Sequence, residues 1–166
     1  MFVLGIDPGL SATGYALVIS TPSSMQAVSA GVIRTNRGLP MSERLVELYS
    51  DLAALIAEHR PDEVAIERVF VNRNLQTVEG VGRASGVAML AAAMAGLAVH
   101  EYTPSAVKKA IVGVGTASKQ QVQELVARRL GLQAAPAPAD AADALAIAMC
   151  HLQSAPLQRA IREAGR

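Results

Sequence analysis

Four carboxylates stand at the boundaries of apolar segments, where ordinary packing would not place a charge. Asp7 and Glu67 each close an apolar run, and Asp140 and Asp143 open an alanine-rich run. An unpaired buried carboxylate is very costly, and no Lys or Arg lies within a few residues of Asp7, Asp140 or Asp143. Because Mg²⁺ prefers oxygen ligands, a fold that gathers these residues predicts a metal-dependent phosphoryl-transfer site.

Each carboxylate also has a purely structural interpretation. Capping and the helix macrodipole favour acidic residues where a helix begins, which fits Asp140 and Asp143. Asp7 precedes Pro-Gly and could be a turn residue. Glu67 could pair with Arg68 on the surface. None of these interpretations explains acidic residues that close two apolar strands, so we favour the metal site.

The 166 residues are most simply one domain, which we place at 1–156 with a basic tail at 157–166. The single cysteine, Cys150, cannot form an intrachain disulfide, which fits a reducing compartment. The N-terminus lacks a charged signal-peptide region, and the longest nearly apolar run, 86–99, is too short to span a bilayer. We therefore expect a soluble cytoplasmic protein without membrane contact, with Cys150 in the core and not a nucleophile.

The hydrophobic pattern predicts an α/β fold. We expect strands at residues 2–7, 13–20, 26–35, 62–67 and 97–102, the first three as an antiparallel meander. We expect helices at 42–60, 75–95, 104–112, 118–130 and 140–151, with Ser118 as an N-cap and an extended linker at 133–139. This order predicts a mixed sheet with helices on its faces, Asp7 and Glu67 near neighbouring strands, and Asp140 and Asp143 on one helix face.

Phe70 is unusual among the five aromatic residues because it lies just beyond a predicted strand end, three residues after Glu67. It could be a loop residue folded back on the core. Alternatively, it could act as a wedge or a stacking platform for an unpaired base.

Positive charge is concentrated locally although the formal net charge is only +1. A local patch decides nucleic-acid binding more than the total does, and solvated helix faces are the ordinary alternative. The basic groups are Arg68, Arg73 and Arg83, then Lys108, Lys109 and Lys119, and finally the tail.

The segment 5–9 with Thr13 and Gly14 also admits a nucleotide-phosphate site, as in the acetate kinase–sugar kinase–actin class. Those proteins need two such domains around a cleft, and 166 residues cannot supply both. The three histidines, His59, His100 and His151, show no metal-ligand spacing.

Several motifs together resemble the RuvC family of Holliday-junction resolvases, over roughly residues 1–151. The matching segments are 5–9, 13–15, 65–67, Phe70, Asn74, 82–88, 112–115, Lys119 and 140–148. The resemblance implies an RNase H-like fold, here a five-stranded mixed sheet with helices on both faces. It also implies a homodimer that nicks four-way DNA junctions in recombination and repair, with Mg²⁺ as cofactor and the RuvAB branch-migration machinery as partner.

The resemblance also assigns roles to individual residues. The acidic tetrad corresponds to Asp7, Glu67, Asp140 and Asp143, and the junction-probing aromatic residue to Phe70. Lys108 and Lys119 correspond to phosphate-binding lysines. We expect two Mg²⁺ ions per site, with Mn²⁺ as an alternative, and Lys119 near the scissile phosphate. Arg73 and Lys109 complete the expected DNA-binding set.

Two other functions remain open at this point. One is a different RNase H-like nuclease, such as an RNA:DNA-hybrid hydrolase, against which Phe70 and dimerisation argue. The other is a non-catalytic junction-binding module, which would not need intact acidic residues. The glycines and alanines of helix 75–95 allow close helix approach, which packing within one chain would also explain. The resemblance to the RuvC family implies a two-fold interface that includes this helix. We expect a bulky charged residue at Gly86 or Ala84 to weaken dimerisation without unfolding the chain.

Overall fold

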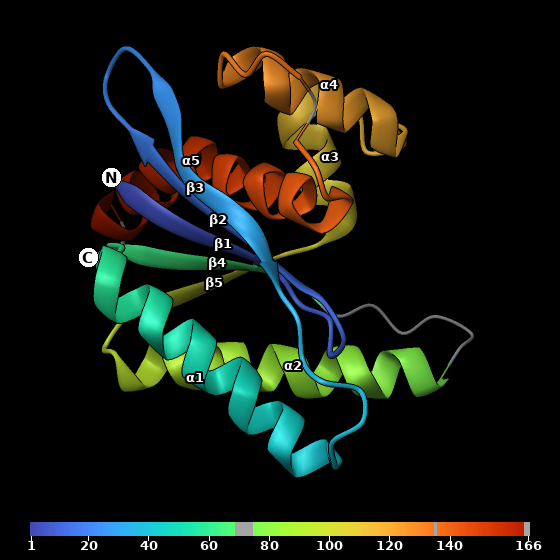
Figure 1. Cartoon of the computed structure of the whole chain (residues 1–166). Helices are drawn as coiled ribbons and strands as arrows, with labels where there is room; N and C mark the ends of the chain where they lie inside the picture. Colours follow the sequence, from blue (N-terminus) through green and yellow to red (C-terminus); the bar gives the residue numbers. More distant parts are fainter. Residues whose placement is uncertain (69–74, 135, 165–166) are drawn as a thin grey trace.

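The computed structural model of the chain describes residues 1–68, 75–134 and 136–164 (Figure 1). Its centre is a five-stranded sheet in the order β3-β2-β1-β4-β5. Strands β1, β2 and β3 pair antiparallel, whereas β4 pairs parallel with both β1 and β5. The predicted meander and mixed sheet are thus confirmed. The strand bounds are β1 Phe2–Asp7, β2 Thr13–Ser20, β3 Met25–Ile33, β4 Glu63–Glu67 and β5 Ala98–Tyr102.

Helices cover both faces of the sheet (Figure 1). One face packs against α1 (Met41–His59) and α2 (Leu75–Met94), and the other against α5 (Ala139–Ala164). Helices α3 (Pro104–Val112) and α4 (Lys119–Arg129) pack against α5 on that second face. No helix in the described ranges is both long and apolar enough to cross a membrane.

Alternation along β1 and β4 decides which side chains meet α5. Leu4 and Ile6 belong to the core cluster under α1 and α2, whereas Val3 belongs to the cluster around α5. On β4, Ala65 likewise faces the α5 cluster. Because strand side chains alternate between faces, Asp7 and Glu67 also lie on the α5 side of the sheet.

The predicted end of the last helix at residue 151 is wrong, because α5 continues to Ala164 with Pro156 inside it. A proline inside a helix removes one backbone hydrogen bond. Here Leu152 and Ala155 are buried in the core, so packing holds the helix in place beyond His151. The residues expected to begin a basic tail at 157 are therefore still helical.

The expectation that a charged residue at Ala84 of α2 would weaken dimerisation without unfolding the chain is wrong. Its side chain is fully buried in the core cluster under α1 and α2, so a charged residue there would disrupt the chain's own packing. Gly86 is exposed, and a Cβ added there would meet no heavy atom within 4 Å. Only Gly86 of the two residues thus remains suited to that test.

Cys150 lies in the core, as expected. Its side chain is buried within α5, and this burial raises the pKa of the thiol to about 11. A thiol with so high a pKa is almost entirely protonated near neutral pH, whereas the thiolate is the nucleophilic form. Cys150 is therefore a packing residue.

Candidate active site

Two parallel strands bring Asp7 and Glu67 to the same edge of the sheet. Strand β1 pairs with β4 so that Ile6 lies opposite Ile66, and each carboxylate follows its strand's isoleucine. The prediction that Asp7 and Glu67 lie on or near neighbouring strands is confirmed, because β1 and β4 are adjacent. Both side chains point toward α5, the helix that contains the other two carboxylates.

Two glycines let α5 approach the sheet closely enough to complete the cluster. A Cβ atom on Gly5 of β1 would overlap the carbonyl oxygen of Ala144, and one on Gly14 of β2 would overlap the carbonyl oxygen of Asp140. Glycine is therefore required at both positions by the close backbone approach. The first turns of α5 consequently lie directly over the ends of β1 and β2.

Three carboxylates converge there. One ligand oxygen each from Asp7, Asp140 and Asp143 can be chosen so that all three lie within 4.8 Å of one another. Glu67 is not part of that closest group, but it lines the same open pocket as Asp143. A set made entirely of carboxylate oxygens suits a hard divalent cation such as Mg²⁺, so the residues present fit the metal that the sequence predicted.

The carboxylates repel one another strongly. Burial raises the pKa of Asp7 to about 7, helped by the charges of Glu67, Asp143 and Asp140, and Lys119 opposes the shift. Burial and the charge of Asp143 likewise raise the pKa of Glu67. Repulsion of this kind, in a cleft at the end of a sheet, is typical of sites that bind a cation.

Lys119 contacts the acidic cluster directly. Its ammonium nitrogen lies 2.6 Å from Asp143 Oδ2. This hydrogen bond raises the pKa of Lys119, as do the negative charges of Asp143, Asp7 and Asp140. Lys119 begins α4, where Ser118 caps the helix in a capping box with Gln121, so the predicted N-cap is confirmed.

The other predicted DNA-binding residues divide into three groups. Lys108 lines the pocket beside Glu67 and Lys119, and its charge lowers the pKa of Glu67. Lys109 follows it on α3 but is exposed and does not line this pocket. Phe70 and Arg73 lie outside the described residues.

A family model described as crossover junction endodeoxyribonuclease RuvC matches residues 3–151 of this chain. The chain belongs to the RuvC family. Curated relatives in this family include the crossover junction endodeoxyribonucleases RuvC of Syntrophomonas wolfei and Chloroflexus aurantiacus. The first is 51% identical over 93% of this chain and 90% of its own length. The second is 49% identical over 96% of this chain and 98% of its own length.

Solved structures agree with this assignment. RuvC of Thermus thermophilus in complex with a Holliday junction substrate is 35% identical, with a TM-score of 0.89 over 95% of this chain and 96% of that one. The yeast mitochondrial Holliday junction resolvase Ydc2 is 16% identical, with a TM-score of 0.62 over 89% and 77% of the two chains, and shows the fold alone. The predicted RNase H-like fold and the resemblance to the RuvC family are confirmed.

A second polar cluster was missed by the sequence analysis of this RuvC-family chain. Glu63, His100 and His151 can each offer a ligand atom within 4.8 Å of the others. Their sequence separations match no metal motif. The signal was periodicity: Glu63 lies four residues before Glu67 on β4, and His151 lies eight residues after Asp143 on α5. Both therefore share a face with a carboxylate of the first site.

Proposed function

We propose that this chain is a structure-selective endonuclease that resolves four-way DNA junctions by hydrolysing phosphodiester bonds, in homologous recombination and repair. The observation that supports this most directly is the convergence of Asp7, Asp140 and Asp143, with Glu67 beside them, on a lysine-lined pocket. Membership of the RuvC family favours a junction over an RNA:DNA hybrid as substrate. The cluster of mutually repelling carboxylates argues against a non-catalytic binding module, which would not need it.

The four carboxylates would hold two Mg²⁺ ions, with Mn²⁺ as an alternative. When bound, such ions supply an activated water and stabilise the leaving 3′ oxygen. The chain's own contribution is to hold the ligands close together although their charges repel one another. Gly5 and Gly14 achieve this by allowing α5 to lie directly on the sheet.

Lys119 would act on the scissile phosphate. A fixed ammonium group beside the acidic cluster stabilises negative charge as it develops in the transition state. Lys108 borders the same pocket and would bind a neighbouring phosphate. Lys109 would contact the junction outside this pocket. Arg73 and Phe70, which lie outside the described residues, complete the expected DNA-binding set, and Phe70 would insert between bases.

Two copies of the chain would act together. Helix α2 has an exposed stripe that includes Gly82, Gly86, Leu90 and Met94, of which Leu90 is 53% and Met94 68% exposed. A two-fold contact along this stripe would bury these apolar side chains and present two acidic clusters to two strands. This arrangement would produce paired symmetric nicks, and RuvAB is the partner that the family resemblance implies.

A cleavage assay tests the proposal. A labelled synthetic four-way junction, a linear duplex of the same sequence and an RNA:DNA hybrid are each incubated with the protein, with and without Mg²⁺. We expect Mg²⁺-dependent nicks at symmetric positions in the junction and none in the duplex. Preferential cleavage of the hybrid would support the alternative nuclease, and junction binding without cleavage would support the binding module.

A further inference from the structure

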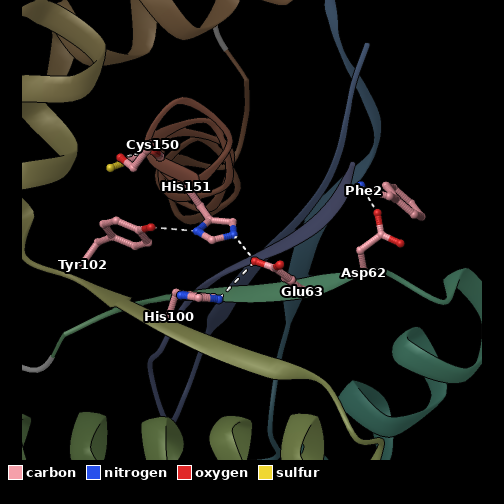
Figure 2. A network of polar contacts seen from close by, with 8 residues as sticks. Phe2, Asp62, Glu63, His100, Tyr102, Cys150 and His151 are labelled. Atoms are coloured by element: carbon pink, nitrogen blue, oxygen red, sulfur yellow. Dashed lines mark hydrogen bonds and ion pairs between the residues drawn. The ribbon is translucent and has the colours of Figure 1, made fainter. Parts of the chain in front are cut away.

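The second polar cluster joins three elements through one glutamate. Figure 2 shows Glu63 of β4 pointing toward His100 of β5 and His151 of α5. Glu63 Oε2 lies 3.0 Å from His100 Nε2 and 2.7 Å from His151 Nε2. Tyr102 lies on the other side of His151, with its hydroxyl oxygen 2.7 Å from Nδ1. The cluster thus aims two imidazole Nε2 atoms at one carboxylate oxygen.

This cluster is separate from the acidic active site. Glu63 begins β4 and Glu67 ends it, so the two side chains share a face but lie roughly 13 Å apart along the strand. On α5, His151 follows Asp143 by eight residues, or roughly 12 Å of helix. The proposed cleavage chemistry uses none of Glu63, His100 and His151.

The two histidines are held differently. His151 is fully buried, and its Nδ1 contact with Tyr102 fixes the ring orientation. The Nε2 atom lies at hydrogen-bond distance from Glu63 Oε2, so one proton lies between them in the metal-free chain. A metal ion at Nε2 would replace that proton, and Nδ1–H would then donate to the tyrosine oxygen. Orientation by an outer hydrogen bond of this kind is typical of metal-bound histidines. The Nε2 atom of His100 is buried and makes no hydrogen bond of good geometry, although it lies near Glu63.

From this geometry we propose that Glu63, His100 and His151 form a second metal site, specific for a transition-metal ion such as Zn²⁺. Zn²⁺ binds imidazole nitrogen and carboxylate oxygen about 2.0–2.2 Å away, in tetrahedral geometry. Tetrahedral ligand atoms at that range lie roughly 3.4 Å apart. The carboxylate oxygen of Glu63 therefore has to move away from His100 Nε2 by roughly 0.4 Å and from His151 Nε2 by roughly 0.7 Å. A water can supply the fourth ligand, because the Glu63 and His100 side chains are 17% and 15% exposed.

The donor set separates this site from the acidic cluster. Imidazole ligands favour Zn²⁺ and its neighbours, whereas a set made only of carboxylates favours Mg²⁺ or Mn²⁺. The chain therefore offers one oxygen-only site and one site with two nitrogens. Excess Mg²⁺ occupies the first site and leaves the second available.

Occupation of the second site links the elements that support the first. Strand β4 presents Glu67, and α5 presents Asp140 and Asp143. An ion held by Glu63 and His151 joins the start of β4 to the middle of α5, with His100 adding β5. Because an ion bound only by the folded chain stabilises it by mass action, Zn²⁺ raises the thermal stability of the protein.

The test uses the full chain, stripped of metal and then kept in excess Mg²⁺. Zn²⁺ is titrated against a chromophoric chelator, and the melting temperature is measured with and without Zn²⁺. We expect one Zn²⁺ per chain and a higher melting temperature. His100→Gln should weaken Zn²⁺ binding at least tenfold and remove the thermal shift, whereas His59→Gln, on α1, should change neither. The absence of Zn²⁺ binding in the unsubstituted chain would overturn the proposal, as would equal binding by His100→Gln.

A second pair of measurements guards against misfolding and against Zn²⁺ binding at the acidic cluster. Nuclear magnetic resonance of the unsubstituted chain should show Zn²⁺ shifting the ring signals of His100 and His151 but not those of His59. The double variant Asp140→Asn/Asp143→Asn should still bind one Zn²⁺. Shifts absent from both cluster histidines, or loss of Zn²⁺ binding in the double variant, would assign the ion to the acidic cluster and refute the second site.

Discussion

The Lys119 ammonium nitrogen lies 2.6 Å from Asp143 Oδ2, which joins the start of α4 to the carboxylates of α5 and β1. The two residues are 24 positions apart in the sequence, and their contact places a positive charge beside the acidic cluster. In the proposed metal-bound state Asp143 would be a metal ligand, and Lys119 would be available to a phosphate.

Replacing Lys119 with Gln should slow junction cleavage by about 10²-fold, because a charge aimed at the developing transition state is lost. Junction binding should weaken less, with the salt dependence of binding falling by about one unit of slope. Single-turnover cleavage and binding titrations at several salt concentrations measure the two effects.

Lys109→Gln is the matched control, since Lys109 is exposed on α3 and does not line the pocket. It should reduce the salt slope by the same amount and leave the single-turnover rate near that of the unsubstituted enzyme. Equal loss of rate in both variants would mean that Lys119 has no special position at the reacting phosphate.

Asp7→Asn should abolish cleavage and yet stabilise the metal-free protein at pH 8. The substitution removes a carboxylate whose pKa is raised to about 7 by burial and by neighbouring charges. The basic surface is unchanged, so junction binding should persist. Thermal melting, a band-shift assay and a cleavage assay test the three outcomes, and near-normal cleavage would contradict the metal assignment.

The raised pKa of Asp7 also predicts how pH changes the stability of the metal-free protein and its affinity for Mg²⁺. Between its ordinary value of 3.8 and about 7, the folded chain holds a proton that the unfolded chain has lost. This group's contribution therefore makes the metal-free protein less stable as pH rises through that window. Because Mg²⁺ competes with the proton, its apparent affinity should rise by up to about tenfold per pH unit below pH 7 and then level off. Calorimetric titration from pH 5.5 to 8.5 measures this, and Asp7→Asn should flatten the curve.

Gly14→Ala should impair metal binding although Gly14 has no ligand atom. The added methyl group would overlap the Asp140 carbonyl oxygen and push α5 away from β2. Overpacking of this kind costs about 1–3 kcal/mol. Gly38→Ala is the control, because the nearest atom to its added Cβ is Oδ1 of the exposed Asn36, at 3.3 Å. If Gly14→Ala binds Mg²⁺ as tightly as the control does, the close approach of α5 is not what assembles the site.

Gly86→Arg should convert the proposed dimer to a monomer without unfolding it, because the position is exposed and a Cβ there meets nothing within 4 Å. Sedimentation at micromolar concentration and melting temperature report the two properties. Val28→Arg, at an exposed position on β3, should leave the dimer intact. A Gly86→Arg chain that remains dimeric would remove α2 from the interface.

The fold class and the four candidate carboxylates could both be predicted from the order of the residues alone. Apolar runs and their periodicity fix which segments are strands and helices, and a charge at the end of such a run is visible without coordinates. The end of α5 was missed because Pro156 normally stops a helix, and the burial of Leu152 and Ala155 that overrides it depends on packing against the core. The sequence likewise did not show that Ala84 is buried and Gly86 exposed, because α2 has small or apolar residues on every side.

Which distant residues meet depends on how the helices pack against the sheet and could not be predicted from the sequence. Lys119 and Asp143 come into contact because α4 packs on α5. Asp140 lies close to Asp7 because Gly5 and Gly14 have no side chains to keep α5 away from the sheet. The three residues Glu63, His100 and His151 span 89 positions, so no local spacing could reveal them. Strand alternation fixes the face of each side chain, but the order β1-β4-β5 and the seating of α5 decide which faces meet. Those depend on the summed packing of the whole core, which no short segment specifies.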